Sequence, residues 1–139
     1  MVFTGFSRTA STIAEEQIHN IKSKYSELLK MKELTDEALS ILTNDSCSLD
    51  EFGKLLNSQW LIKREMSSKI TNKQIDDIYT SAVDAGALGG KLLGAGSGGF
   101  MILYVKPESQ EKVKNVLKDL LIFDFDFESE GSSIIHYKP

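Results

Sequence analysis

The chain has little of what several kinds of protein site require. Its 139 residues contain one cysteine, Cys47, and two histidines that stand far apart, His19 and His136. A single cysteine excludes an internal disulfide, and no Cys and His spacing typical of a metal cluster is present. No apolar run approaches 18 residues and no basic and apolar leader opens the sequence, so we expect a cytoplasmic protein that does not enter a membrane.

Basic residues are also too few to favour a polyanionic partner. Lys and Arg total 16 against 20 Asp and Glu, which gives a net charge of −4. Nucleic acids and anionic membranes are bound mainly by basic surfaces, so we expect neither as a partner. The composition, with 41% hydrophobic and 26% charged residues, is ordinary for a globular protein, and we interpret residues 1–139 as one domain.

Glycine, in contrast, is concentrated in one short segment between two apolar runs. Four of the ten glycines lie within six positions, and this segment is our candidate site: Gly94, Ala95, Gly96, Ser97, Gly98 and Gly99. The pattern predicts a strand, a glycine loop and a second strand. Residues with almost no side chain add nothing to a core, so we expect the loop to bring backbone NH groups close to an anion or to another backbone.

Two familiar phosphate-binding motifs do not fit this loop. Gly94, Gly96 and Gly99 have the spacing G-x-G-x-x-G, but a dinucleotide fold would begin a helix there, whereas 100–105 is a β-type run. A P-loop needs Lys and then Ser or Thr after the last glycine, and Phe100 and Met101 stand there instead. A glycine-rich hairpin that serves only tight backbone packing remains open as an alternative.

Helical periodicity covers most of the remaining chain. Apolar residues recur at three and four positions, Ser48 and Thr71 are expected N-caps, and Pro107 suits a first helical turn. Gly86 is expected to end the helix before the hairpin. The expected helices are a long one over 13–29 and others over 34–42, 49–60, 71–85 and 107–120.

The C-terminal region changes to a period of two. Over 121–128, Phe123, Phe125 and Phe127 alternate with three carboxylate residues, which predicts a strand with one aromatic and one acidic face. We interpret the acidic face as solvated and expect no metal there. A last strand is expected over 133–137. The order of elements indicates an α+β layered sandwich, an antiparallel sheet with helices packed on one face.

The glycine loop and its flanks resemble a known family. Residues 84–100, which include Lys91-Leu92-Leu93-Gly94-Ala95-Gly96-Ser97-Gly98-Gly99-Phe100, are similar to the third conserved motif of the GHMP kinases, and most similar to the sugar-phosphate branch typified by D-glycero-D-manno-heptose 7-phosphate kinase. Residues 3–10 are similar to the segment that opens the C-terminal domain of that branch, and 55–63 to its middle helix. One departure is Ser97, where the family often has glycine.

The resemblance implies a ferredoxin-like C-terminal domain of an ATP-dependent sugar-phosphate kinase, with heptose 7-phosphate as the expected acceptor. The family's nucleotide-binding segment, Pro-x-x-x-Gly-Leu-Gly-Ser-Ser, is absent, and Met1 leads directly into the first apolar run. We therefore expect the N-terminal half, with the catalytic residues, to be missing and the isolated chain to be inactive. ATP and Mg would act in the parent enzyme, and the glycine loop would form one wall of its active site.

Five residues are candidates for binding the sugar-phosphate substrate. Arg8 follows Thr4 and Ser7 at a strand end, where a guanidinium suits a phosphate oxygen. Trp60 and Lys63 are one helical turn apart and could flank the substrate, although a Trp on an apolar stripe is more often a core residue.

Two further expectations concern partners and class. A surface that faced an N-terminal half would be exposed in this chain, so we expect a homodimer or concentration-dependent association. The competing hypothesis is a noncatalytic ligand-binding or regulatory α+β module that retains a glycine hairpin.

Overall fold

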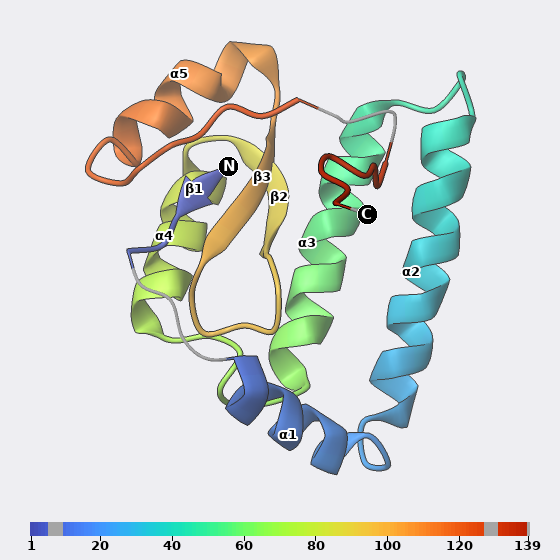
Figure 1. The fold of residues 1–139 in the computed structure, drawn as a ribbon. Coiled ribbons are helices and arrows are strands. Elements are labelled where there is room, and N and C mark those ends of the chain that lie inside the picture. Colours follow the sequence, from blue (N-terminus) through green and yellow to red (C-terminus); the bar gives the residue numbers. More distant parts are fainter. Residues whose placement is uncertain (6–9, 127–130, 139) are drawn as a thin grey trace.

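The computed structural model describes residues 1–5, 10–126 and 131–138, with side chains from residue 14 onward in the first helix. Three strands and five helices form an α+β arrangement, which confirms the predicted fold class (Figure 1). In chain order they are β1 Val2–Phe3, α1 Ala10–Asn20, α2 Tyr25–Thr43, α3 Leu49–Glu65, α4 Lys73–Asp84, β2 Ala87–Leu92, β3 Phe100–Val105 and α5 Pro107–Val116.

The sheet is antiparallel with the order β1-β3-β2, so the first strand of the chain lies beside the last. In the β2–β3 hairpin, Lys91 pairs with Ile102 and Leu92 with Met101, and on the other side of β3 Val2 pairs with Met101. This register places the N-terminal strand next to the base of the glycine loop.

Side-chain alternation separates a core face from an open face of the sheet. Met101 is fully buried, whereas its neighbour Phe100 is 37% exposed, as period-two geometry requires. The core is contributed by β1, the hairpin and helices α3, α4 and α5; its fully buried side chains include Trp60, Ile70, Ile75, Leu92 and Met101.

Two glycines let α3 lie directly on β2. A Cβ on Gly89 would be 2.1 Å from the carbonyl oxygen of Gly53 and 2.7 Å from the backbone nitrogen of Asn57, distances that no side chain can occupy. Helix and strand therefore pack backbone against backbone. This contact brings the C-terminal turns of α3, with Trp60 and Lys63, towards the end of β2 where the glycine loop begins.

The prediction of one long helix over 13–29 is wrong, because the chain turns at 21–24. α1 ends at Asn20, whose side-chain amide donates to the carbonyl of Met66, and α2 then continues to Thr43 and absorbs the helix predicted over 34–42. The apolar stripe was misleading, since Ile18 is 66% exposed and Tyr25 is 61% exposed. In Figure 1, α2 lies alongside α3, and α1 lies across the closed end of the hairpin.

Several predicted ends of elements are confirmed and one is corrected. The Ser48 hydroxyl caps α3 by accepting from the backbone nitrogen of Asp50, Gly86 has a φ of 113° after α4, and Pro107 begins α5. The N-cap of α4 is Asn72, whose side chain accepts from the nitrogen of Ile75; the Thr71 hydroxyl instead donates to Asp76.

The two C-terminal strands are not formed as predicted. Ile122 makes an isolated bridge with Val2, supported by hydrogen bonds from the nitrogen of Phe3 to Leu121 and from that of Phe123 to Met1. Beyond this point 124–126 is not a strand, and 127–130 lies outside the described residues. The expected strand over 133–137 is absent from the structure. Ile134 and Ile135 are 84% and 96% exposed, so no buried surface holds this segment in a sheet.

Candidate functional site

The glycine loop closes the hairpin at the end that faces α1 (Figure 1). Its backbone enters the left-handed region at Gly94 (φ 71°), Gly96 (φ 124°), Ser97 (φ 66°) and Gly99 (φ 93°). Such values are strained for residues with a side chain, which explains why glycine occupies three of these four positions.

One side of the loop is fixed against the connector between α3 and α4. A Cβ on Gly96 would lie 2.9 Å from the Cα of Ile70. The next residue, Ser97, donates its backbone NH to the Ile70 carbonyl (2.7 Å) and its hydroxyl to the Lys69 carbonyl. Ser97 is buried, so in this structure its hydroxyl serves the contact with the connector.

On the other side of the loop, a Cβ on Gly94 or on Gly99 would meet no atom within 4 Å among the residues that the structure describes, although both glycines have a positive φ. Tight packing within the described residues therefore accounts for Gly96 and not for Gly94 or Gly99. A partner could approach the bare backbone on this side.

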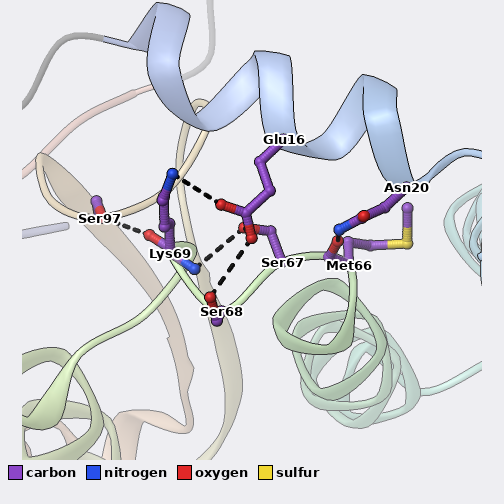
Figure 2. A network of polar contacts seen from close by, with 7 residues as sticks. All are labelled: Glu16, Asn20, Met66, Ser67, Ser68, Lys69 and Ser97. Carbon is purple, nitrogen blue, oxygen red and sulfur yellow. Dashed lines mark hydrogen bonds and ion pairs between the residues drawn. The ribbon is translucent and has the colours of Figure 1, made fainter.

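A polar network joins α1 to the connector that holds the loop (Figure 2). The Glu16 carboxylate accepts from the Ser67 hydroxyl at 2.7 Å and pairs with the Lys69 ammonium at 3.0 Å. The hydrogen bond from Ser67, followed by that from Lys69, lowers the pKa of Glu16. Gln17 also donates to the carbonyl of Ala95 in the loop itself.

Glu16, Gln17 and Ser67 were not predicted from the sequence as part of the site. The only signal was that residues 16, 17 and 20 share one helical face, and the sequence did not show which segment that face meets. All three take part in fixing the loop, either through the connector or by a direct contact.

Thr4 is tied to the last residue of the loop. Its backbone NH and its hydroxyl both donate to the Gly99 carbonyl at 2.9 Å, and its own carbonyl accepts from the Gln74 amide. Thr4 is fully buried, so it anchors the chain and presents no surface to a substrate here. Ser7 and Arg8 lie outside the described residues.

Lys63 lies where β2 runs into the loop. Its ammonium donates to the carbonyl of Gly94 at 2.6 Å and to that of Leu92 at 3.2 Å. Burial, and then the charge of Lys91, lowers the pKa of Lys63 to about 8.

Trp60 does not occupy the position proposed for a substrate contact. It is 0% exposed and its ring packs 6.1 Å from that of Tyr79, with the Arg64 guanidinium 6.0 Å from the ring centre. Of the pair predicted to flank a substrate, only Lys63 reaches the loop, because the stripe that carries Trp60 points into the core.

The described part of the chain has no candidate metal site and no candidate membrane-spanning helix. No group of three His, Cys, Asp or Glu side chains within it could hold a metal ion, and Cys47 is exposed with a free thiol. Within the same residues, no helix combines the length and the apolar character that a bilayer crossing requires.

Sequence relatives of the chain are kinases. It is 32% identical to D-glycero-alpha-D-manno-heptose 7-phosphate kinase of Campylobacter jejuni, over 94% of this chain and 39% of that protein. It is 31% identical to mevalonate kinase of Thermococcus gammatolerans, over 65% of this chain and 27% of that protein. The chain thus spans well under half the length of these relatives.

Solved structures support the same relationship. Mevalonate kinase of L. major, crystallised with R-mevalonate, superimposes on 85% of this chain with a TM-score of 0.71 at 20% identity, using 36% of its own length. Mevalonate kinase of Methanococcus jannaschii covers 88% with a TM-score of 0.69 at 26% identity, using 37% of its length. The family model "GHMP kinases C terminal" matches residues 45–122, more than half of the chain and the whole of the glycine loop. The chain belongs to the GHMP kinase family, as a C-terminal domain.

Proposed function

We propose that this chain is the C-terminal domain of an ATP-dependent sugar-phosphate kinase, in which the glycine loop forms one wall of the active site. The sugar-phosphate acceptor, with heptose 7-phosphate as the first candidate, is supported by the 32% identical relative. The observation that carries the proposal is the two-sided loop, fixed at Gly96 and Ser97 and open at Gly94 and Gly99.

The loop suits phosphoryl transfer because that reaction depends on positioning and on stabilising charge that spreads over phosphate oxygens. A backbone held by Ile70 and Lys63 does not have to reorganise when a phosphate chain or its binding loop approaches. The open glycines allow this approach without a side chain in the way. The loop would therefore order the nucleotide-binding segment of the other half of the enzyme.

The described residues fit a supporting role towards ATP and Mg. They include no acidic cluster for a cation, and the loop offers backbone groups only. Mg²⁺ is normally held by carboxylates and phosphate oxygens, so its ligands would come from the nucleotide and the N-terminal half. ATP, when bound, supplies the phosphoryl group. Arg8 and Lys63 remain our proposed contacts to the acceptor phosphate.

The test adds a side chain on the open side of the loop while keeping the backbone. Gly94 has a φ of 71° and free space around it, and asparagine tolerates this conformation better than most residues. In the full-length kinase that contains this domain, we expect Gly94→Asn to lower kcat/KM for ATP at least tenfold with little change in melting temperature.

Gly131→Asn is the matched control. Gly131 has a φ of 70° and equally open surroundings, but it lies outside the loop, so activity should be unchanged. Normal turnover in Gly94→Asn would contradict the proposal that a partner approaches this side of the loop.

A further inference from the structure

Three side chains in the segment 133–137 are more exposed than any other large hydrophobic side chain of the described residues. Ile134, Ile135 and Tyr137 are 84%, 96% and 77% exposed, and Ile18 follows with 66%. A single exposed apolar residue is ordinary on a protein surface, but three within four positions form a continuous apolar stretch. Such a stretch is typical of a contact surface.

The backbone of this segment is also without partners in the described part of the chain. Residues 131–138 form no helix or strand there, and they make no hydrogen bond or ion pair with another described residue. The residue types nevertheless favour a strand, because Ile and Tyr have high β propensity. A strand-forming segment with unpaired NH and carbonyl groups can pair with the edge of a sheet elsewhere.

Alternation along a strand would place these side chains on both faces. Ile135 and Tyr137 would lie on one face, and Ile134 on the other. An apolar residue on each face is typical of a strand that is covered on both sides, whereas a strand with one solvated face alternates apolar and polar residues. The segment therefore fits a sheet edge at which both faces are covered by other elements.

The sheet of this chain does not hold the segment. At one end of the sheet β1 is hydrogen-bonded to 121–123, and at the other end α3 packs on β2 through Gly53 and Gly89. The match to the C-terminal domain of the family also ends at residue 122, so 133–137 lies outside the matched region. Both observations favour a partner beyond the described fold.

We propose that residues 133–137 add as a β-strand to the open edge of a sheet in the N-terminal half of the kinase. The relatives support this occupant, because the chain spans only 39% and 27% of the two kinases to which it is 32% and 31% identical. A partner within the same polypeptide has a high effective concentration, so a short strand is enough to hold it. The inference rests on the proposed function only in requiring that this half exists.

Hydrogen exchange measured by mass spectrometry tests the strand in the full-length kinase and in the isolated chain. In the isolated chain the amides of 134–138 should exchange at rates close to those of an unstructured peptide, at every protein concentration. In the full-length kinase about half of these amides should exchange slower by about a hundredfold or more, because alternate NH groups of an added strand point to its neighbour.

Ile135→Asp and Ser132→Asp form a matched pair of variants. Both add one negative charge at an exposed position, and Ser132 lies just outside the segment. Ile135→Asp should leave the melting temperature of the isolated chain unchanged, because this side chain is 96% exposed there. In the full-length kinase it should remove the protection of 134–138 and lower the melting temperature, since a charge would be buried at the sheet edge. Ser132→Asp should leave both unchanged, and Ile135→Val should keep the protection.

Three results would overturn the proposal. The first is exchange at 134–138 that is as fast in the full-length kinase as in the isolated chain. The second is protection in the isolated chain at every concentration, which would mean pairing within the chain. The third is protection that rises with concentration, which would mean pairing with a second copy. Exchange does not measure turnover, so an active kinase with fast exchange would refute the strand alone, and a protected but inactive protein would refute the proposed function alone.

Discussion

The backbone nitrogen of Ser97 lies 2.7 Å from the carbonyl oxygen of Ile70, and this hydrogen bond joins the glycine loop to the connector between α3 and α4. The same connector is held from its other side by Glu16 of α1, through Ser67 and Lys69 (Figure 2). The shape of the loop therefore depends on segments that are about 30 and 80 residues away in the sequence.

Replacement of Gly96 by valine should be strongly destabilising. A positive φ of 124° alone costs about 1–3 kcal/mol for a β-branched residue, and the added Cβ would collide with the Ile70 backbone, which cannot move aside easily. We expect the free energy of unfolding, measured with denaturant, to fall by at least this amount, and activity of the full-length kinase to be lost.

Ala95→Ser is the control for Gly96→Val. Ala95 is a neighbouring loop residue without a positive φ, so the change should be mild. A Gly96→Val protein of nearly normal stability would show that the loop is not fixed against Ile70.

Loss of the Glu16 charge should loosen the loop from a distance. In Glu16→Gln the ion pair with Lys69 is lost and the hydrogen bonds from the serine hydroxyls are weakened. We expect amide hydrogen exchange at Ser97 to accelerate several-fold relative to that at Met101 in the core. Glu111→Gln, which removes an exposed pair with Lys114, is the control and should leave both rates unchanged.

The same network gives an acid dependence. The pKa of Glu16 is lowered by Ser67 and Lys69 in the folded chain, so its contribution is complete above the ordinary value of 4.5 and is lost as the pH falls through the lowered pKa. In the wild type, the exchange rate at Ser97 relative to that at Met101 should thus increase only below about pH 4.5. Equal exchange rates in Glu16→Gln and wild type at neutral pH would show that Glu16 does not stabilise the loop.

The sequence predicted the hairpin and its glycine loop because local signals agree there. Short apolar strands, clustered glycines and the Gly86 helix end all act over a few residues, and the structure has each of them. What the sequence could not predict depends on contacts between distant segments. The fixed side of the loop depends on the contact of Gly96 with the backbone of Ile70, a residue far away in the sequence. The break at 21–24 accompanies the contact of Asn20 with Met66.

The errors in the C-terminal region have the same origin. Alternation of Phe with Asp predicts a strand only if a neighbouring strand accepts its hydrogen bonds, and β1 is two residues long. The edge of β1 is occupied by 121–123, and the described residues 124–126 and 131–138 are not assigned to a strand. Trp60 and Lys63 are one turn apart on α3, yet Trp60 is buried in the core whereas Lys63 reaches the loop. The apolar stripe in the sequence did not distinguish these two positions.

The lowered pKa of Lys63 predicts a stability change at alkaline pH. The pKa is about 8 in the folded chain and near 10.5 when unfolded, so the unfolded chain binds more protons between these values. The cost of burying the charge is complete below pH 8 and is relieved as the pH rises towards 10.5.

Denaturant unfolding at pH 7 and pH 10 checks this effect. Because Lys63 keeps some contact with solvent, we expect a relative gain of about 1–2 kcal/mol in wild type that is missing in Lys63→Met. Identical pH profiles for the two proteins would show that the Lys63 charge is not buried.

The isolated chain should fold but bind ATP poorly. The described residues offer no acidic cluster for Mg²⁺ and only one wall of backbone for a phosphate chain. We expect a helical circular dichroism spectrum and a cooperative melt, but no ATP binding at millimolar concentration and no kinase turnover. Micromolar ATP affinity by calorimetry would mean that the nucleotide site lies within this chain.

The open face of the sheet should make the isolated chain associate with a second copy. Phe100 lies 5.3 Å from Phe3 and 5.6 Å from Phe123 between ring centres, and Phe100 and Phe123 are 37% and 42% exposed. Three aromatic rings in contact, from β1, β3 and the segment 121–123 beside β1, form an apolar patch of a kind that is uncommon on monomers and favours self-association. We expect the weight-average mass in sedimentation equilibrium to rise with concentration.

Two variants distinguish association through this aromatic patch from association through any exposed apolar side chain. Phe100→Thr keeps a residue of high strand propensity in β3 and removes the central ring, so it should shift association to at least several-fold higher concentration. Ile135→Ser removes an apolar side chain that is 96% exposed and is not one of the three rings, and it should leave association unchanged. If the wild type remained monomeric at all concentrations, or if Ile135→Ser weakened association as much as Phe100→Thr, the aromatic patch could not be the contact surface.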